Sequence, residues 1–204
     1  MRLALALVIA LAATQGLTAD GPHVSNPNTR IRPVDKRVAS LVAAGMARST
    51  TFRALVRHLE ASDVIVHIEA RRDLREGVGG ALRYVANSAT DRFLRVQLNA
   101  AYHDHTLVAL LGHELQHAVE VADHAEVRSA DDLRTFYRRT GVRTGPDAFD
   151  STAARETGYL VRAEILRKPG DDLRFARRTA SGDEAKLLDG SPIVAEEVEV
   201  PGSH

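Results

Sequence analysis

The stretch TLVALLGHELQHAVEVA, residues 106–122, decides the fold of this chain. At 3.6 residues per turn it is long enough for about four and a half turns of helix. It is apolar on all sides except at a few polar positions. A helix that is apolar all round is buried by the rest of its domain. We therefore expect this helix at the centre of the protein, with the other elements packed around it.

The polar exceptions in this helix form the motif His113-Glu114-Leu115-Gln116-His117. Residues four apart stand one turn above each other on a helix, so the two imidazoles can meet at one cation. The carboxylate of Glu114 lies about 100° further round the helix, where it can reach a water on the metal rather than the metal itself. The spacing therefore predicts His113 and His117 as metal ligands and Glu114 as a general base.

The composition narrows the choice of ligands and partners. The chain has 204 residues, no cysteine, nine histidines, and 27 basic against 27 acidic side chains. Without thiols, a metal has to be held by imidazole and carboxylate groups, both of which Zn²⁺ accepts. The balanced charge provides no overall field that would attract a polyanion, so we expect no nucleic-acid partner. The length suits a single domain.

Three stretches before the central helix alternate apolar and polar residues, which is typical of strands with one buried face. They are VIVHIEA at 64–70, ALRYVA at 81–86 and RFLRVQLN at 92–99, and the glycine-rich residues 77–80 predict a turn before the second. Amphipathic spacing and capping residues predict further helices at 34–47, after a cap at Thr51, between Ser129 and Gly141, and over 150–168. The expected fold class is α+β, with a small three-stranded sheet packed on the central helix and further helices.

The motif resembles the HExxH signature of the zincin metallopeptidases, and the chain is similar to their gluzincin branch. The resemblance implies an exported zinc-dependent peptidase with a zincin-like domain over residues 33–170, which cleaves peptide or protein substrates with a zinc-activated water. It also implies that the edge strand before the helix binds substrate in extended form, so that Phe93 to Asn99 would line the cleft. The alternative is a non-catalytic zinc-binding or protein-interaction domain that keeps this helix.

The third zinc ligand is open among several acids. The metzincin pattern would need glycine at 120 and histidine at 123, where this chain has Glu120 and Asp123. Gluzincins take the third ligand from a later helix, and the inward-facing acids of the helix expected over 150–168 are Asp150 and Glu164. We favour Asp150, although an acid at this place can simply be the N-cap of the helix. Asp123 stays an alternative, and we expect Glu120 to orient His117.

An oxyanion stabiliser would complete the chemistry, because attack on a peptide carbonyl creates negative charge. Tyr137, Tyr102, His103 and His105 are candidates by residue type alone, and Tyr137 is more simply a core aromatic. His103 and His105 flank Asp104 and could hold a second metal, but a solvated loop is the better interpretation of this cluster.

The two ends of the chain differ from the rest. Met1-Arg2 and the apolar residues 3–13 predict a signal peptide over residues 1–19, and hence a secreted or periplasmic protein without stable membrane insertion. The polar residues 20–32 predict a flexible leader. The charged residues 171–204 predict a loosely ordered tail with one short strand at Ile193-Val194.

Overall fold

The computed structural model describes residues 29–75, 77–145 and 148–167. The predicted signal peptide, most of the predicted leader, and the tail with its short strand at 193–194 lie outside these residues. The leader ends earlier than expected, because Ile31–Pro33 forms a strand that pairs with a neighbour. Within the described ranges, no helix is both long enough and apolar enough to cross a membrane.

The described residues fold into helices, one four-stranded sheet and one two-stranded sheet, which is the α+β class that the sequence predicts. The elements follow one another as β1 (Ile31–Pro33), α1 (Lys36–Arg48), α2 (Thr50–Glu60), β2 (Val64–Arg71), β3 (Gly80–Asn87), β4 (Arg92–Asn99), α3 (Asp104–Ala122), α4 (Ala130–Thr140), β5 (Val142–Arg143), β6 (Phe149–Asp150) and α5 (Thr152–Leu166). The three predicted strands are β2, β3 and β4, and the sheet has four strands instead of the predicted three because the short strand β1 pairs with β2. The predicted central helix is α3.

The order of strands in the larger sheet is β1-β2-β4-β3. β1, β2 and β4 run parallel, and β3 pairs antiparallel with β4 at one edge. The expectation that residues 93–99 form the edge strand is therefore wrong, because β4 pairs with β2 on one side and with β3 on the other. The edge next to β4 belongs to β3, where Val85 is 49% exposed.

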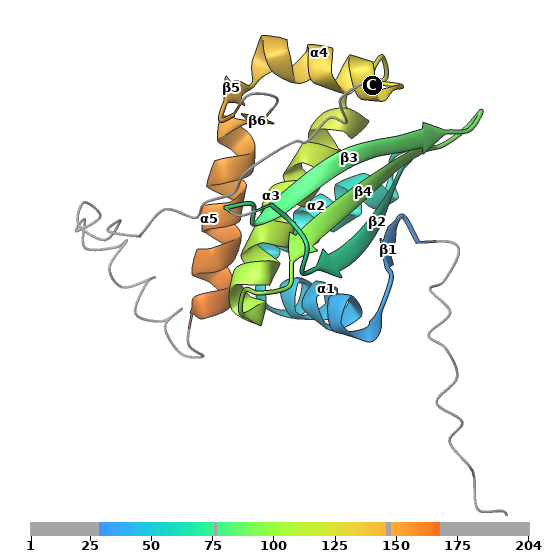
Figure 1. Ribbon diagram of the computed structural model, residues 1–204. Helices are drawn as coiled ribbons and strands as arrows, with labels where there is room; N and C mark the ends of the chain where they lie inside the picture. Colours follow the sequence, from blue (N-terminus) through green and yellow to red (C-terminus); the bar gives the residue numbers. More distant parts are fainter. Residues whose placement is uncertain (1–28, 76, 146–147, 168–204) are drawn as a thin grey trace, which may run out of the picture.

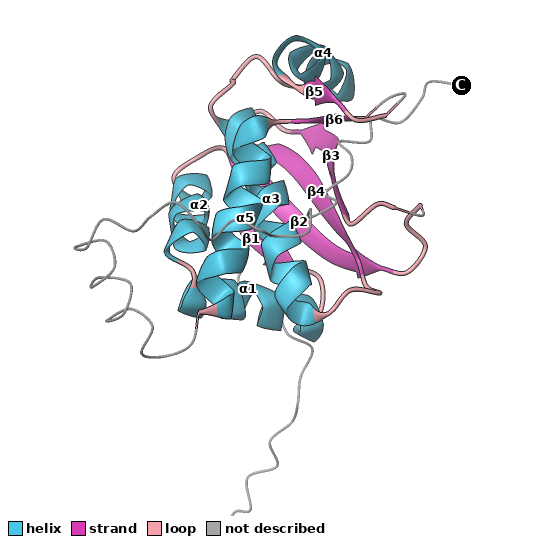
Figure 2. Ribbon diagram, turned by 90° about the vertical axis from the view of Figure 1, so that its left-hand side faces the viewer, coloured by secondary structure: helices cyan, strands magenta, loops and turns pink. Residues whose placement is uncertain are grey.

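Helices α1, α2, α3 and α5 lie on one face of this sheet, and no described helix lies on the other face (Figures 1 and 2). The strand residues on the helix side are fully buried, as the alternation predicts: Val64, Val66 and Ile68 of β2, and Leu94, Val96 and Leu98 of β4. α3 is buried along almost its whole length and packs against both the sheet and α5. The site motif therefore sits inside the protein.

The caps of two helices show how the sequence prediction succeeds and fails. Ser129 caps α4 as predicted, since its hydroxyl accepts a hydrogen bond from the N–H of Asp132. α2 is capped by Ser49 instead of Thr51, which lies inside the first turn. The hydroxyls of Ser49 and Thr51 both donate to the carboxylate of Glu164 in α5. Glu164 therefore joins α5 to the start of α2.

Arg92, the first residue of β4, ties the C-terminal end of α3 to the sheet. Its guanidinium is 1% exposed and donates to both carboxylate oxygens of Asp63, at 2.6 and 2.8 Å. It also donates to the backbone carbonyls of Val121, Ala122, His124 and Val127. The last carbonyls of a helix have no donor within the helix, so this arginine satisfies them. The hydrogen bond from Arg92 holds the pKa of Asp63 below its ordinary value.

We expect Arg92→Met to lower the free energy of unfolding by about 2–4 kcal/mol, because it removes the ion pair with Asp63 and takes this donor from the backbone carbonyls of Ala122 and Val127. Urea unfolding followed by circular dichroism measures this loss. Arg95→Met is the matched control on the same strand, since Arg95 is exposed and its loss should change stability by no more than about 0.5 kcal/mol. Equal effects of the two substitutions would contradict the anchoring role of Arg92.

Candidate metal centre

Two glycines let α5 lie close against α3 at the level of the histidines. A Cβ atom on Gly112 would lie 2.8 Å from Cγ2 of Val161, and one on Gly158 would lie 3.3 Å from Cβ of His113. Both distances are shorter than ordinary contact between carbon atoms, which is about 3.5–4.0 Å. The missing side chains therefore set how closely α5 approaches, and with it the residue that precedes α5, Asp150.

Asp150 lies at the end of β6 and points at both histidines of the motif. Its Oδ1 lies 3.3 Å from Nε2 of His113 and 3.4 Å from Nε2 of His117, and the two Nε2 atoms are 3.2 Å apart. All three side chains are almost completely buried. Ser151, not Asp150, is the N-cap of α5, and its hydroxyl accepts from the N–H of Ala154. The structure thus brings together the three residues predicted as ligands.

The spacing of these three atoms fits one metal ion. In a tetrahedral zinc site with bonds of about 2.0–2.1 Å, two ligand atoms are about 3.3–3.4 Å apart. Oδ1 of Asp150 is buried and makes no hydrogen bond, an arrangement that costs free energy unless a cation faces the oxygen. Within the described part of the chain, no fourth histidine, cysteine, aspartate or glutamate joins this group. Three protein ligands are typical of catalytic zinc sites, whereas structural sites have four.

The charges of the group also favour a cation. Burial lowers the pKa of His113, which keeps this imidazole in the neutral form that binds metals. Burial would also lower the pKa of His117, but the carboxylates of Asp150 and Glu120 outweigh it and raise this pKa to about 10. Burial would raise the pKa of Asp150, yet the two histidines hold it well below its ordinary value. Without a metal, His117 therefore carries a proton where a metal ion would fit.

Glu120 and Tyr137 hold His117 from the other side of its ring. Nδ1 of His117 lies 2.9 Å from Oε2 of Glu120 and 2.8 Å from the hydroxyl of Tyr137, which donates to Glu120 at 2.7 Å. Ser151 donates to the second oxygen of Glu120. Partners of this kind fix the orientation of a metal-binding imidazole. Glu120 thus has the predicted orienting position, and Tyr137 is a buried core aromatic as predicted, whose hydroxyl also contacts the site.

The side chain of Glu114, a residue of α3, lies next to Gly80, the first residue of the edge strand β3. Its side chain is 1% exposed, and its Oε2 has no hydrogen-bond partner. A Cβ atom on Gly80 would lie 2.7 Å from Oε1 of Glu114, so the space for this carboxylate depends on the glycine. Burial raises the pKa of Glu114 to about 8, which is within reach of proton transfer near neutral pH.

The other candidate residues lie away from this group. Glu164 joins α5 to α2, and Asp123 is exposed and pairs with a histidine of α2. Tyr102, His103 and His105 are exposed at the start of α3, and His105 is about 12 Å along the helix from His113. The rings of His103 and His105 stack on each other, and neither belongs to a metal-binding group among the described residues.

Sequence reasoning missed the residues that place the ligands. The sequence analysis does not predict that Gly80 and Gly158 lie at the site. It also does not predict that Ser151, rather than Asp150, is the N-cap of α5, which leaves the Asp150 side chain able to point at the histidines. Arg155 lies 3.6 Å from Oδ2 of Asp150 and helps to orient it. One signal was available: serine follows Asp150, and serine is as good an N-cap as aspartate.

The chain matches no protein-family model, no curated protein and no solved structure. The geometry of the site itself is therefore the basis on which its function is inferred.

We expect Asp150→Ala to weaken zinc binding by more than about 100-fold, because even residues that only orient a ligand contribute 10–100-fold. Competition with a chromogenic chelator measures the affinity, and elemental analysis measures the metal content, which should be about one zinc per wild-type chain. Asp123→Ala is the control, an exposed aspartate just after α3 that should leave binding unchanged. Wild-type affinity in Asp150→Ala would exclude Asp150 as a ligand.

Zinc binding should also depend on pH in a defined direction. Zinc needs the neutral imidazole, while the raised pKa of His117 keeps this residue protonated below about pH 10. Each rise of one pH unit between about 7 and 8.5 should therefore tighten binding at least about tenfold, with release of one proton from His117 and, below about pH 8, a further fraction of a proton from Glu114, whose raised pKa falls beside a cation. Titration calorimetry in two buffers of different ionisation enthalpy counts the proton. An affinity that stays constant over this range would show that His117 is already neutral.

Proposed function

We propose that this chain is a zinc-dependent peptidase whose metal is held by His113, His117 and Asp150. The observation that carries the proposal is the buried triangle of their three ligand atoms, with sides of 3.2, 3.3 and 3.4 Å. Glu114 is buried on the same helix, and the charges of His117 and Asp150 act on its pKa. A purely structural zinc site would need a fourth ligand and would have no use for an unpartnered acid next to it.

Zinc supplies two kinds of chemistry when bound in such a site, since it polarises a carbonyl oxygen and makes water a better nucleophile. Glu114 would take the proton of the attacking water and later deliver it to the leaving amine. Its pKa of about 8 in the protein without metal falls when a cation is placed nearby, which brings it closer to neutral pH. Glu120 and Tyr137 would keep His117 oriented throughout.

The substrate-binding strand in this proposal is β3 in place of the 93–99 segment that the resemblance implies. No described strand pairs with the outer edge of β3, so its backbone groups on that side can pair with an extended peptide. The first residue of β3, Gly80, touches Glu114. A peptide lying along this edge would therefore pass next to the general base.

We expect Glu114→Gln to keep its zinc and to lose hydrolysis by about 10²–10⁴-fold, because glutamine cannot accept the proton. The measurement is cleavage of a fluorogenic peptide library, with metal content determined on the same samples. Glu156→Gln is the matched control, an exposed acid on α5 that should leave both properties unchanged.

Two outcomes would contradict the proposal. Full activity in Glu114→Gln would remove this residue from the chemistry. A zinc-loaded wild-type protein that cleaves no member of the library would favour the non-catalytic zinc-binding domain.

A further inference from the structure

The carboxylate of Glu120 uses its two oxygens in two different directions. Oε2 lies 2.9 Å from Nδ1 of His117 and accepts from the hydroxyl of Tyr137 at 2.7 Å, whereas Oε1 accepts from the hydroxyl of Ser151. His117 is one of the three candidate metal ligands, and Ser151 directly follows another, Asp150. One side chain of α3 therefore contacts a ligand on its own helix and the segment that carries a ligand from elsewhere in the chain.

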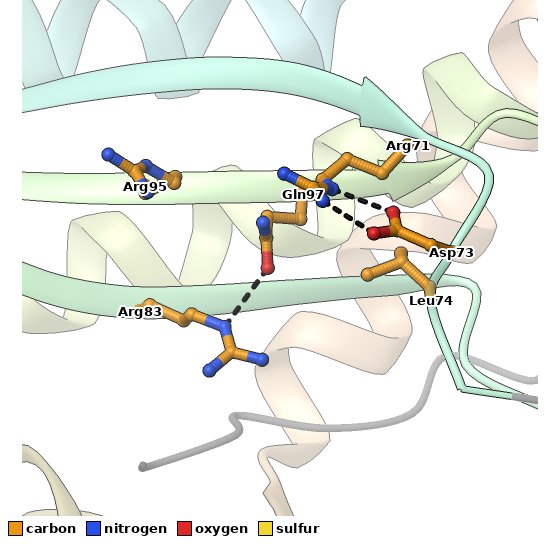
Figure 3. Close-up of a pocket in the computed structure, with 6 residues that line it drawn as sticks. All are labelled: Arg71, Asp73, Leu74, Arg83, Arg95 and Gln97. Carbon is orange, nitrogen blue, oxygen red and sulfur yellow. Dashed lines mark hydrogen bonds and ion pairs between the residues drawn. The ribbon is translucent and has the colours of Figure 1, made fainter.

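Another carboxylate of the protein shows a simpler arrangement. Asp73 lies at a cavity of about 290 Å³ on the face of the sheet away from the helices, and both of its oxygens accept from the single guanidinium of Arg71, two residues earlier (Figure 3). Such a pair links neighbouring residues of one segment. The partners of Glu120 are 3, 17 and 31 residues away along the chain, so its contacts bring separate elements together.

Ser151 makes two hydrogen bonds with its one hydroxyl. The oxygen accepts from the N–H of Ala154 and so caps α5, while the proton is donated to Glu120. A hydroxyl has one donor and two acceptor positions, so both bonds can be made at once. The hydroxyl thus joins the first turn of α5 to α3, at the residue next to Asp150.

The strand that carries Asp150 needs such a link, because the strand is short. β6 has two residues and pairs with the equally short β5. Arg155 approaches Oδ2 of Asp150 at 3.6 Å, which is too long for a hydrogen bond. A metal ligand has to be held within about 0.5 Å of its place by the contacts around it. The bond from Ser151 to Glu120 provides one such contact between the segment of Asp150 and α3.

We propose that Glu120 and Ser151 are positioning residues that couple two metal ligands, His117 and Asp150. One oxygen of Glu120 orients the ring of His117, and the other holds the segment of Asp150 through Ser151. The proposal rests on the proposed function for the presence of the metal, and neither residue takes part in the chemistry. A carboxylate suits this role because it accepts on both oxygens, whereas the amide of glutamine has a single acceptor oxygen.

Zinc affinity of the full chain, measured by competition with a chelator, tests the coupling in a double-mutant cycle. Ser151→Gly removes the hydroxyl while glycine remains an acceptable N-cap, and we expect it to weaken zinc binding about tenfold. Glu120→Ala should weaken it about 100-fold. Because Ser151 acts through Glu120, adding Ser151→Gly to Glu120→Ala should cost less than about twofold more. Two independent residues would instead multiply their effects to about 1,000-fold.

Two further variants separate positioning from helix capping. Ser151→Thr keeps both the hydroxyl and the cap, so it should bind zinc within about threefold of the wild type. Ser129→Gly is the matched control, because Ser129 caps α4 in the same way, and it should leave zinc affinity unchanged. Co²⁺ bound in place of zinc adds a readout that a loss of stability alone does not move. Its absorption bands, which depend on coordination geometry, should shift in Ser151→Gly and stay the same in Ser129→Gly.

The outcomes separate this proposal from the proposed function. Wild-type zinc affinity in Ser151→Gly, or effects of Ser151→Gly and Glu120→Ala that multiply, would overturn the coupling even if the wild type cleaves peptides. Coupled effects on zinc affinity in a protein that cleaves no peptide support the positioning roles and count against the peptidase. A wild type that binds no zinc would overturn both. If Glu120→Ala does not fold, Glu120→Gln takes its place in the cycle, since its one amide oxygen cannot accept on both sides.

Discussion

Two imidazole nitrogens and one carboxylate oxygen that face a single buried point are the constraint on which the rest of this structure depends. These atoms lie 3.2–3.4 Å from one another and are almost completely removed from water, so a positive charge between them, either a proton on His117 or a metal ion, stabilises the arrangement. The surrounding elements supply what this arrangement needs. α3 carries the two histidines inside the protein, two glycines let α5 approach, and the cap at Ser151 leaves the carboxylate of Asp150 to point inward.

The fold could be predicted from the sequence wherever a local pattern determines it. The apolar stretch around His113 makes a buried helix, and alternation at 64–70 and 92–99 makes strands with one fully buried face. The order of the strands could not be predicted, because alternation is the same for a central strand and an edge strand. It took the pairing of β4 with both β2 and β3 to show that the edge is β3.

The site residues also differ in whether a local sequence pattern or only tertiary packing determines their positions. His113, Glu114 and His117 are given by spacing on one helix, whereas Asp150 comes from a segment that only tertiary packing brings near. Helical periodicity predicts that the side chains of Asp150 and Glu164 both point into the protein. In the structure Asp150 lies before α5 begins, and Glu164 accepts hydrogen bonds from the hydroxyls of Ser49 and Thr51. Periodicity cannot decide which of several inward acids meets a partner on another element.

Gly80 has a consequence for the recognition of relatives of this chain. Its absent side chain is the space that the Glu114 carboxylate occupies, so any larger residue at this position would push the acid out of place while leaving the HExxH letters intact. In a relative with the same helix, a glycine some thirty positions upstream of the acid would indicate that this space is kept, and a larger residue would indicate that the acid lies elsewhere.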